Sequence, residues 1–349
     1  MRNIKAIVLL LTVAAVSAAT VFYGGVTLAF SDTFTTTSSL PSSQIEEHTN
    51  TIPQKEEPRN EVSSSATATL PAETSSESII VSENHTVSGK IISKTINPKS
   101  AALSASGVYM KNSSGADIDI KTELAAGTKI HITKNAEPQV LIMHTHTTES
   151  YVSESRNYYT KDDASRSTDN NRNMAAIGDI ITAKVEAAGY GVIHDTTQHD
   201  YPSYSGSYDR SKETIKAYLK KYPSIKIVID VHRDALAGDG TDKIKLVKEI
   251  EGKNAAQVML VMGSQTGKVT GYQNWRQNLR LAMLFHQKIE KMYPGLARPM
   301  VVASKLYNQH LTTGSMLIEI GTDANSLEEA KYSAELVGNS LVSLLADLS

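Results

Sequence analysis

Two histidines stand one residue apart at the end of an apolar run in the stretch "VLIMHTHTTESY", residues 140–151. A core strand has no structural use for the pair His144 and His146, and Glu149 adds a carboxylate shortly after them. Neutral imidazole and carboxylate groups are the usual ligands of catalytic zinc sites, which hold the ion with three protein groups and leave one position open. The spacing therefore predicts a metal site.

A further histidine and a further acid accompany other apolar runs. His232 follows "IKIVIDV" directly, and Glu319 lies inside "SMLIEIG", where an unpaired charge would be costly. If these runs are neighbouring parallel strands, their carboxyl ends share one edge of a sheet, where ligands of such sheets bind. Because residues i and i+2 of an extended segment share a side, we predict that His144, His146 and His232 bind one Zn²⁺.

The two glutamates are predicted to be catalytic. A bound zinc ion lowers the pKa of its water to about 7. Glu319 is then the expected general base and proton shuttle, a role worth roughly 10²–10⁴-fold in rate. Glu149 is expected to serve as a substitute ligand or to orient the ligands. Whether Arg233 and Asp234 pair with each other or with Glu149 stays open.

Composition excludes other chemistries. The 349 residues contain no cysteine, which rules out disulfides, thiolate zinc sites and cysteine nucleophiles. The net charge of -2, without a basic stripe, argues against a nucleic-acid partner. G-x-S-x-G and H-E-x-x-H motifs are absent, and "GSQTGKVT" lacks the glycine spacing of a P-loop.

From Pro138 onward, apolar runs alternate with amphipathic segments. Strands are expected at 139–143, 190–193, 225–231, 256–263 and 315–321, and helices at 173–188, 210–222, 274–293 and 326–348. Ser326 and Glu329 form a capping box at the start of the last helix. This alternation predicts an α/β fold, a three-layer sandwich in which a mostly parallel twisted sheet carries helices on both faces.

Four regions are expected along the chain. Residues 138–349 form the catalytic α/β domain, and residues 89–137 form a short β-rich part with strand-like runs at 90–93, 116–120 and 128–133. The sequence leaves open whether that part is a subdomain or supplies edge strands. Residues 32–88, rich in Ser, Thr, Glu and Pro, are expected to be a disordered linker, because they cannot bury enough apolar surface.

Residues 1–31 are expected to be a transmembrane anchor. Arg2 and Lys5 precede an uncharged stretch from Ala6 to Ser31, and a helix needs roughly 20 residues to cross a bilayer. Basic residues on the short side predict a cytoplasmic N-terminus and an extracytoplasmic remainder. A signal peptide cleaved after Ala19 is the alternative.

The segments "VLIMHTHTTESY", "HDTTQHDYPSYSGSYDRS", "IVIDVHRDA" and "MLIEIGTDANSLEEA" follow one another behind the anchor and the linker. In this order they resemble the stage II sporulation protein P family over residues 89–349. The resemblance implies peptidoglycan degradation during forespore engulfment, by an N-acetylmuramoyl-L-alanine amidase with endopeptidase activity and a fold like that of zinc amidases. It also implies stage II sporulation proteins D and M as partners, and a place in the membrane of the sporangium.

The resemblance carries over to individual positions. His144 or His146, together with His232, would bind zinc, and Glu319 would be catalytic. The glutamate ligand of the related amidases has no clean counterpart, since Asp209 and Glu213 are the only acids in "SGSYDRSKET". His146 or Glu149 would take its place. The tract from 194 to 210 would suit a groove for glycan and stem peptide.

Two other functions stay open. One is another zinc-dependent wall hydrolase, such as a peptidoglycan deacetylase. The other is a non-catalytic wall-binding or assembly protein with the same fold. The products released from peptidoglycan distinguish all three.

Overall fold

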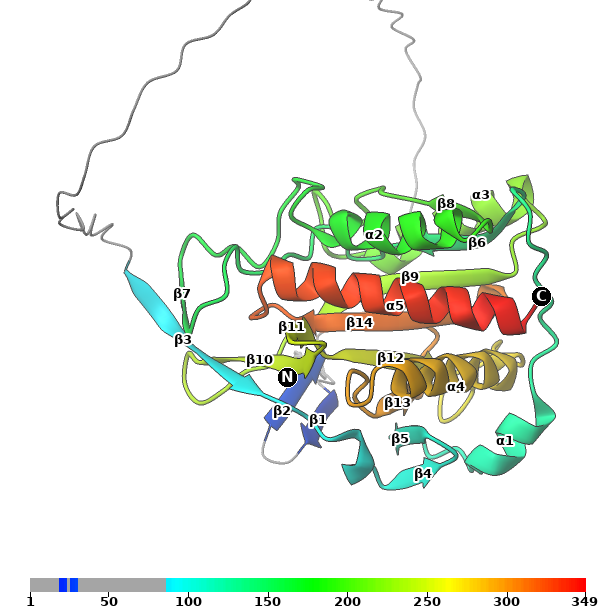
Figure 1. The fold of residues 1–349 in the computed structure, drawn as a ribbon, viewed down its shortest axis with the longest axis horizontal. Coiled ribbons are helices and arrows are strands. Elements are labelled where there is room, and N and C mark those ends of the chain that lie inside the picture. Colours follow the sequence, from blue (N-terminus) through cyan, green and yellow to red (C-terminus); the bar gives the residue numbers. More distant parts are fainter. Residues whose placement is uncertain (1–18, 24–25, 31–85) are drawn as a thin grey trace, which may run out of the picture. The chain divides into compact units, whose positions relative to one another are not determined.

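The computed structural model describes residues 19–23, 26–30 and 86–349 (Figure 1). In the first two ranges, β1 (Ala19–Tyr23) and β2 (Val26–Phe30) form an antiparallel pair. Most of the predicted anchor and nearly all of the predicted linker lie outside the described residues, so both stay predictions. No helix within the described ranges has the length and apolar character needed to cross a membrane.

An eight-stranded sheet forms the centre of residues 86–349. Its spatial order is β4 (Leu103–Ala105), β5 (Val108–Asn112), β13 (Met300–Ala303), β12 (Val258–Gly263), β14 (Ser315–Thr322), β9 (Ile227–Asp234), β6 (Pro138–Met143) and β8 (Gly191–His194). Strands β14, β9, β6 and β8 run parallel to one another, as do β5, β13 and β12. The two groups meet in an antiparallel pair, β12 and β14. The sheet is therefore mostly parallel, as predicted, with one reversal in its interior and an antiparallel edge pair, β4 and β5.

Helices cover both faces of this sheet. Figure 1 shows α2 (Met174–Ala187), α5 (Leu327–Asp347) and α4 (Trp275–Met292) side by side over one face. On strand β6, Val140 and Ile142 join the large apolar core under these helices. Leu141 and Met143 instead pack against Ile215 of α3 (Ser207–Lys221) on the other face. The predicted three-layer α/β fold is confirmed, and the alternation along β6 shows which face each side chain meets.

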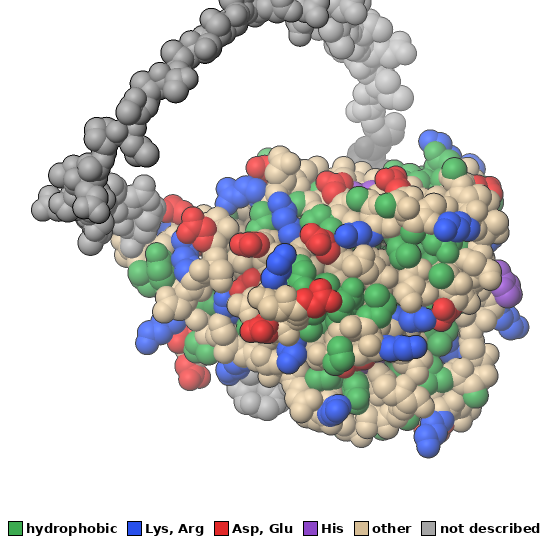
Figure 2. Space-filling view, viewed as in Figure 1, with side chains coloured by type: hydrophobic (Ala, Val, Ile, Leu, Met, Phe, Trp, Pro, Cys, Tyr) green, Lys and Arg blue, Asp and Glu red, His purple; other side chains and the backbone are tan. Residues whose placement is uncertain are grey.

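A smaller sheet adjoins the N-terminus of α5. It contains β11 (Lys253–Ala256), β10 (Lys243–Ile250), β3 (Val87–Lys94) and β7 (Tyr158–Thr160). The short helical turns η1 (Pro98–Ser100) and η2 (Gln309–Leu311) complete the described elements, together with α1 (Ile120–Ala126). Figure 2 shows basic and acidic side chains interspersed over the outer face of the helices.

The segment 89–137 is divided between the two sheets. Strand β3 contains the predicted run 90–93, whereas β4 is an edge strand of the eight-stranded sheet and β5 is its neighbour. The other two predicted runs, 116–120 and 128–133, are not strands. The run 116–120 is not a strand because it leads into α1. The Asp119 side chain caps this helix by accepting a hydrogen bond from the Thr122 backbone N–H at 2.7 Å.

Candidate metal centre

The predicted site lies where β6, β9 and β14 end side by side. These strands are parallel neighbours, so their carboxyl ends share one edge of the sheet. Strand β6 stops at Met143, and the following residues turn back over the edge. Asp230 of β9 fixes this turn, since it accepts hydrogen bonds from the Thr145 backbone N–H at 2.8 Å and from its hydroxyl at 2.6 Å.

The turn brings His146 and Glu149 to His232 of β9. The Nδ1 atom of His146 lies 3.4 Å from Glu149 Oε1, and Nδ1 of His232 lies 3.5 Å from Glu149 Oε2. All three side chains are buried, and one ligand atom from each lies within 4.8 Å of the others. Two imidazoles and one carboxylate thus converge on one point.

This donor set fits zinc. Two ligand atoms bound to one tetrahedral zinc ion at 2.0–2.1 Å lie about 3.3 Å apart, close to both nitrogen–oxygen distances here. Two histidines with a glutamate form one of the known catalytic zinc sets, which leaves a fourth position open. His146, Glu149 and His232 are therefore the residues suited to hold the ion.

The remaining atoms of these ligands are also engaged. His232 Nε2 lies 2.9 Å from Asp230 Oδ1, and His146 Nε2 lies 3.1 Å from the Ser207 hydroxyl. The Arg233 backbone N–H donates to Glu149 Oε2 at 3.3 Å. Partners of this kind orient metal ligands and fix the ring nitrogen that faces the ion.

His144 is placed elsewhere, and its predicted role as a metal ligand does not agree with this geometry. Its ring continues the alternation of Val140 and Ile142 and so lies on the α2 face, where Nε2 is 2.8 Å from His194 Nε2. Its Nδ1 lies 2.8 Å from the Val231 carbonyl oxygen. The prediction assumed an extended chain through His146, but the strand ends before it. Asp209 and Glu213, on α3, are also outside the cluster.

Glu319 of β14 is the Cα partner of His232 in the strand register, so the two residues share a face. Its side chain is buried, and within residues 86–349 its Oε2 atom has no hydrogen-bond partner. Burial, with the carboxylates of Asp234 and Glu149 nearby, raises the pKa of Glu319 to about 8. A buried carboxyl that has an oxygen without a hydrogen-bond partner, beside a group of candidate metal ligands, suits proton transfer.

Charges within the cluster shift the pKa values of Glu149 and His232 in opposite directions. Burial alone would raise the pKa of Glu149, but Arg233 and the two histidines hold it well below its usual value. Burial would also lower the pKa of His232, but Asp230 and Glu149 hold it well above 6.5. Glu149 is therefore ionised, as a carboxylate ligand must be, and His232 would release its proton on binding a metal ion.

The sequence analysis did not predict two residues of the site, Arg298 and Asp230. Arg298 is buried, and its Nη1 atom lies 2.9 Å from Asp234 Oδ2, which answers the open question about the partner of Asp234. It comes from just before β13, and only the reversal of the sheet brings that strand start to this edge. Asp230 had a visible signal, because it is an acid inside the apolar run "IKIVIDV".

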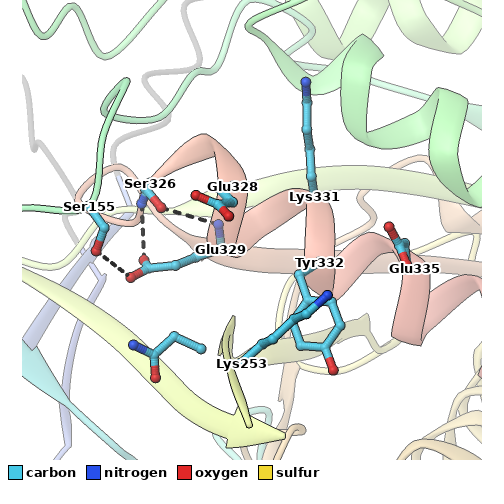
Figure 3. Close-up of a pocket in the computed structure, with 9 residues that line it drawn as sticks. Ser155, Lys253, Ser326, Glu328, Glu329, Lys331, Tyr332 and Glu335 are labelled. Carbon is cyan, nitrogen blue, oxygen red and sulfur yellow. Dashed lines mark hydrogen bonds between the residues drawn. The ribbon is translucent and has the colours of Figure 1, made fainter. Parts of the chain in front are cut away.

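A separate cavity of about 450 Å³ lies at the N-terminus of α5 and contains none of these residues (Figure 3). Its buried groups bind one another. Glu329 accepts hydrogen bonds from the Ser155 hydroxyl and the Ser326 backbone N–H, and it also pairs with Lys245 at 2.7 Å. The predicted capping box of Ser326 and Glu329 is present. These contacts stabilise the start of the helix.

Comparison with known proteins gives a family match. Residues 31–341 match the family model of stage II sporulation protein P. Stage II sporulation protein P of Bacillus subtilis (strain 168) is 30% identical over 206 residues, which are 56% of this chain and 48% of that protein. The chain thus spans about half the length of this curated relative.

Solved structures with a similar fold include N-acetylmuramoyl-L-alanine amidase AmiC2 of Nostoc punctiforme. The match has a TM-score of 0.35 and 9% identity, and it covers 61% of this chain and 97% of that chain. Another is the CwlD amidase from Clostridioides difficile in complex with the GerS lipoprotein, at a TM-score of 0.36 and 11% identity over 60% of this chain and 98% of that chain.

Proposed function

Because this chain belongs to the stage II sporulation protein P family, we propose that it is a peptidoglycan hydrolase of sporulation. Its reaction is cleavage of the amide bond between N-acetylmuramic acid and L-alanine, with endopeptidase activity on peptide cross-links as a second activity. The observation that supports this proposal is the buried cluster of His146, Glu149 and His232 with Glu319 beside it. The cluster is suited to hydrolysis of an unactivated amide.

In this proposal His146, Glu149 and His232 hold zinc. The ion would supply a Lewis acid for the amide carbonyl and lower the pKa of water at the open position. Glu319 Oε2 takes a proton from the attacking water and gives it to the departing amine nitrogen of L-alanine. The C–N bond breaks, and the carboxylate stays on the lactyl group.

The environment of Glu319 suits both halves of this proton transfer. Burial and the carboxylates of Asp234 and Glu149 raise its pKa to about 8, so the ionised and the protonated forms of the side chain are both populated near neutral pH. A protonated carboxyl can donate to a leaving group, and its conjugate base can accept from water. Arg298, bound to Asp234, limits the negative charge around it.

The proposal extends to the setting of the reaction. The N-terminal segment 1–31 would hold the protein in the membrane of the sporangium, with the catalytic domain outside the cytoplasm. Stage II sporulation proteins D and M would be its partners, and peptidoglycan its substrate. These parts rest on the sequence of residues 1–31 and on the family.

Mass spectrometry of products from purified peptidoglycan tests the activity. Incubation with the zinc-supplied protein should release free stem peptides that begin with L-alanine. Glu319→Gln should reduce the rate by about 10²–10⁴-fold, because general acid–base catalysis is lost. Glu335→Gln, an exposed position on α5, is the matched control and should cleave normally.

The other outcomes identify the rival functions. Released acetate in place of stem peptides would indicate a deacetylase, and shortened cross-links alone would make the endopeptidase the main activity. Peptidoglycan that binds the protein and stays intact would indicate a non-catalytic scaffold. Full activity of Glu319→Gln would contradict the assigned role of that residue.

A further inference from the structure

The loop between β8 and α3 presents an uncharged, exposed surface. Residues 201–206 read "YPSYSG", and every one of them is exposed. Tyr201 is 58% exposed and Tyr204 is 40% exposed. Within residues 86–349, the other large apolar side chains this exposed are Val87, Tyr158 and Met292, none of them in this loop. Two tyrosines three residues apart thus offer aromatic surface to solvent.

This surface continues directly from the metal centre. The ring centroids of Tyr204 and His146 lie 4.7 Å apart. The ring of Tyr208, the second residue of α3, lies 5.6 Å from that of His146. The Arg166 guanidinium lies 4.7 Å from the centroid of Tyr204. A group that rests on this loop is therefore adjacent to whatever the cluster holds.

The loop is also held rigidly. Asp200 accepts hydrogen bonds from the Thr148 backbone N–H at 3.1 Å and from the Thr148 hydroxyl at 2.6 Å, which ties the loop to the turn that carries Glu149. Arg210 of α3 donates to the His199 carbonyl at 2.5 Å, to the Ser205 carbonyl at 3.0 Å and to the Ser203 carbonyl. Such bracing reduces the ordering cost of binding a ligand.

We propose that Tyr201 and Tyr204 form a saccharide-binding platform, on which a pyranose ring of the glycan strand rests beside the scissile amide. A pyranose ring has a face of C–H groups and a rim of hydroxyls. The C–H face suits a tyrosine ring, and the rim suits the tyrosine and serine hydroxyls of this loop. The inference rests on the proposed function, because it takes its ligand from the same polymer.

The charges around the platform favour the glycan over the stem peptide. Stem peptides carry carboxylates, and recognition of carboxylates requires an available cation. Residues 201–206 carry no charge. The two cations beside it are both engaged. Arg166 pairs with Asp200 and lies 3.7 Å from Glu149 Oε1, and Arg210 donates to the backbone carbonyls of residues 199, 203 and 205. The platform is therefore assigned to the uncharged part of the substrate.

Titration of the full chain with a β-1,4-linked N-acetylglucosamine tetramer tests the platform, because this probe has no stem peptide. Tyr201→Ala should weaken its binding about tenfold, the order expected for loss of one aromatic stacking contact. Tyr201→Phe, which keeps the ring, should stay within about twofold. Tyr158→Ala, at an exposed tyrosine of β7, is the matched control and should bind as the unchanged protein does.

Tyr201 is the position to change, since Tyr204 contacts the ring of His146. Absence of tetramer binding by the unchanged protein, or equal binding by Tyr201→Ala, overturns the platform. So does a Tyr201→Ala variant that loses affinity for a free stem peptide and keeps it for the tetramer. His232→Ala should lose cleavage and still bind the tetramer, because it changes the cluster and not the platform. If the unchanged protein binds the tetramer but leaves peptidoglycan uncut, only the proposed hydrolysis is contradicted.

Discussion

At the scale of single residues, the ring nitrogens of His146 and His232 that face Glu149 are both Nδ1 atoms. The opposite Nε2 atoms lie 3.1 Å from the Ser207 hydroxyl and 2.9 Å from Asp230 Oδ1. A histidine ligand is specified by the partner of its second nitrogen as much as by its position. Those partners come from α3 and β9, so the metal centre depends on both.

Removal of His146 and removal of His144 should have different effects on zinc binding. His146→Ala removes a ring from the cluster and should abolish the stabilisation by zinc, which for an intact site is about 2.7 kcal/mol at a hundred times the dissociation constant. His144→Ala removes a ring from the α2 face and should keep a zinc-dependent rise in melting temperature. Thermal unfolding with zinc and with a chelator measures both, and the reverse pattern would return His144 to the site.

His286 should make the folded state sensitive to acid. It is buried on α4, and burial lowers its pKa from 6.5 to about 4. Between these values the unfolded chain binds more protons than the folded one, so stability present above pH 6.5 is lost as the pH falls through 4. The loss should reach about 3 kcal/mol.

The variant His286→Leu isolates this contribution. Its free energy of unfolding, measured by urea denaturation at several pH values, should fall less steeply between pH 6.5 and 4 than that of the unchanged protein. His131→Leu, at an exposed position, serves as the control. Parallel pH profiles for His286→Leu and the unchanged protein would exclude His286 as the source.

At the scale of elements, helix α2 has a glycine in its interior for a packing reason. A Cβ atom at Gly178 would lie 2.2 Å from His194 Nε2 and 2.7 Å from His144 Nε2. The missing side chain gives the two histidines room between α2 and the sheet. His144 in turn contacts the Val231 carbonyl, next to the proposed metal ligand His232. Helix α2 thus supports the strand end from the opposite face.

Gly178→Ala should therefore destabilise the protein by about 1–3 kcal/mol through overpacking. In an exposed helix the same change would stabilise by about 1 kcal/mol, so the sign of the effect is the test. The double variant Gly178→Ala with His194→Ala should recover part of the loss, since it removes the nearer of the two contacts. Denaturant unfolding of the four proteins gives this coupling.

Strong periodicity made most elements predictable. The apolar runs that became β6, β9, β12 and β14, and the four long helices, were all expected. Strand β10 was missed although Ile244 and Leu246 alternate with lysines, and β13 is short enough to leave little pattern. His144 lies apart from the cluster of His146, Glu149 and His232, because a period of two holds only while a strand continues.

At the scale of the whole molecule, strand direction was beyond the reach of the sequence. Nothing in the run of β12 indicates that it lies antiparallel to β14, since an apolar core strand reads alike in both directions. Arg298 could not be assigned to the site for this reason. The sequence could group the four other site residues, because β6, β9 and β14 run the same way. These residues lie on those strands or just after them: His146, Glu149, His232 and Glu319.

The N-terminal segment 1–31 should attach the protein to the membrane. The stretch from Ala6 to Ser31 is uncharged and follows two basic residues, so the full chain should sediment with membranes. A chain that begins at residue 86 should stay in the supernatant and keep zinc binding. Alkaline carbonate extraction of both measures this. Release of the full chain by carbonate, or its recovery without the first 19 residues, would favour a cleaved signal peptide.

The reversal between β12 and β14 also separates two kinds of loop. Strand β12 ends at Gly263 beside the start of β14, so the mostly exposed turn at 265–271 projects from the edge opposite the candidate metal centre. Exposed turns of this kind are where a folded chain best accepts foreign sequence. A fluorescent tag or an epitope inserted at this turn would report on the protein in a living sporangium and leave the substrate-facing edge unobstructed.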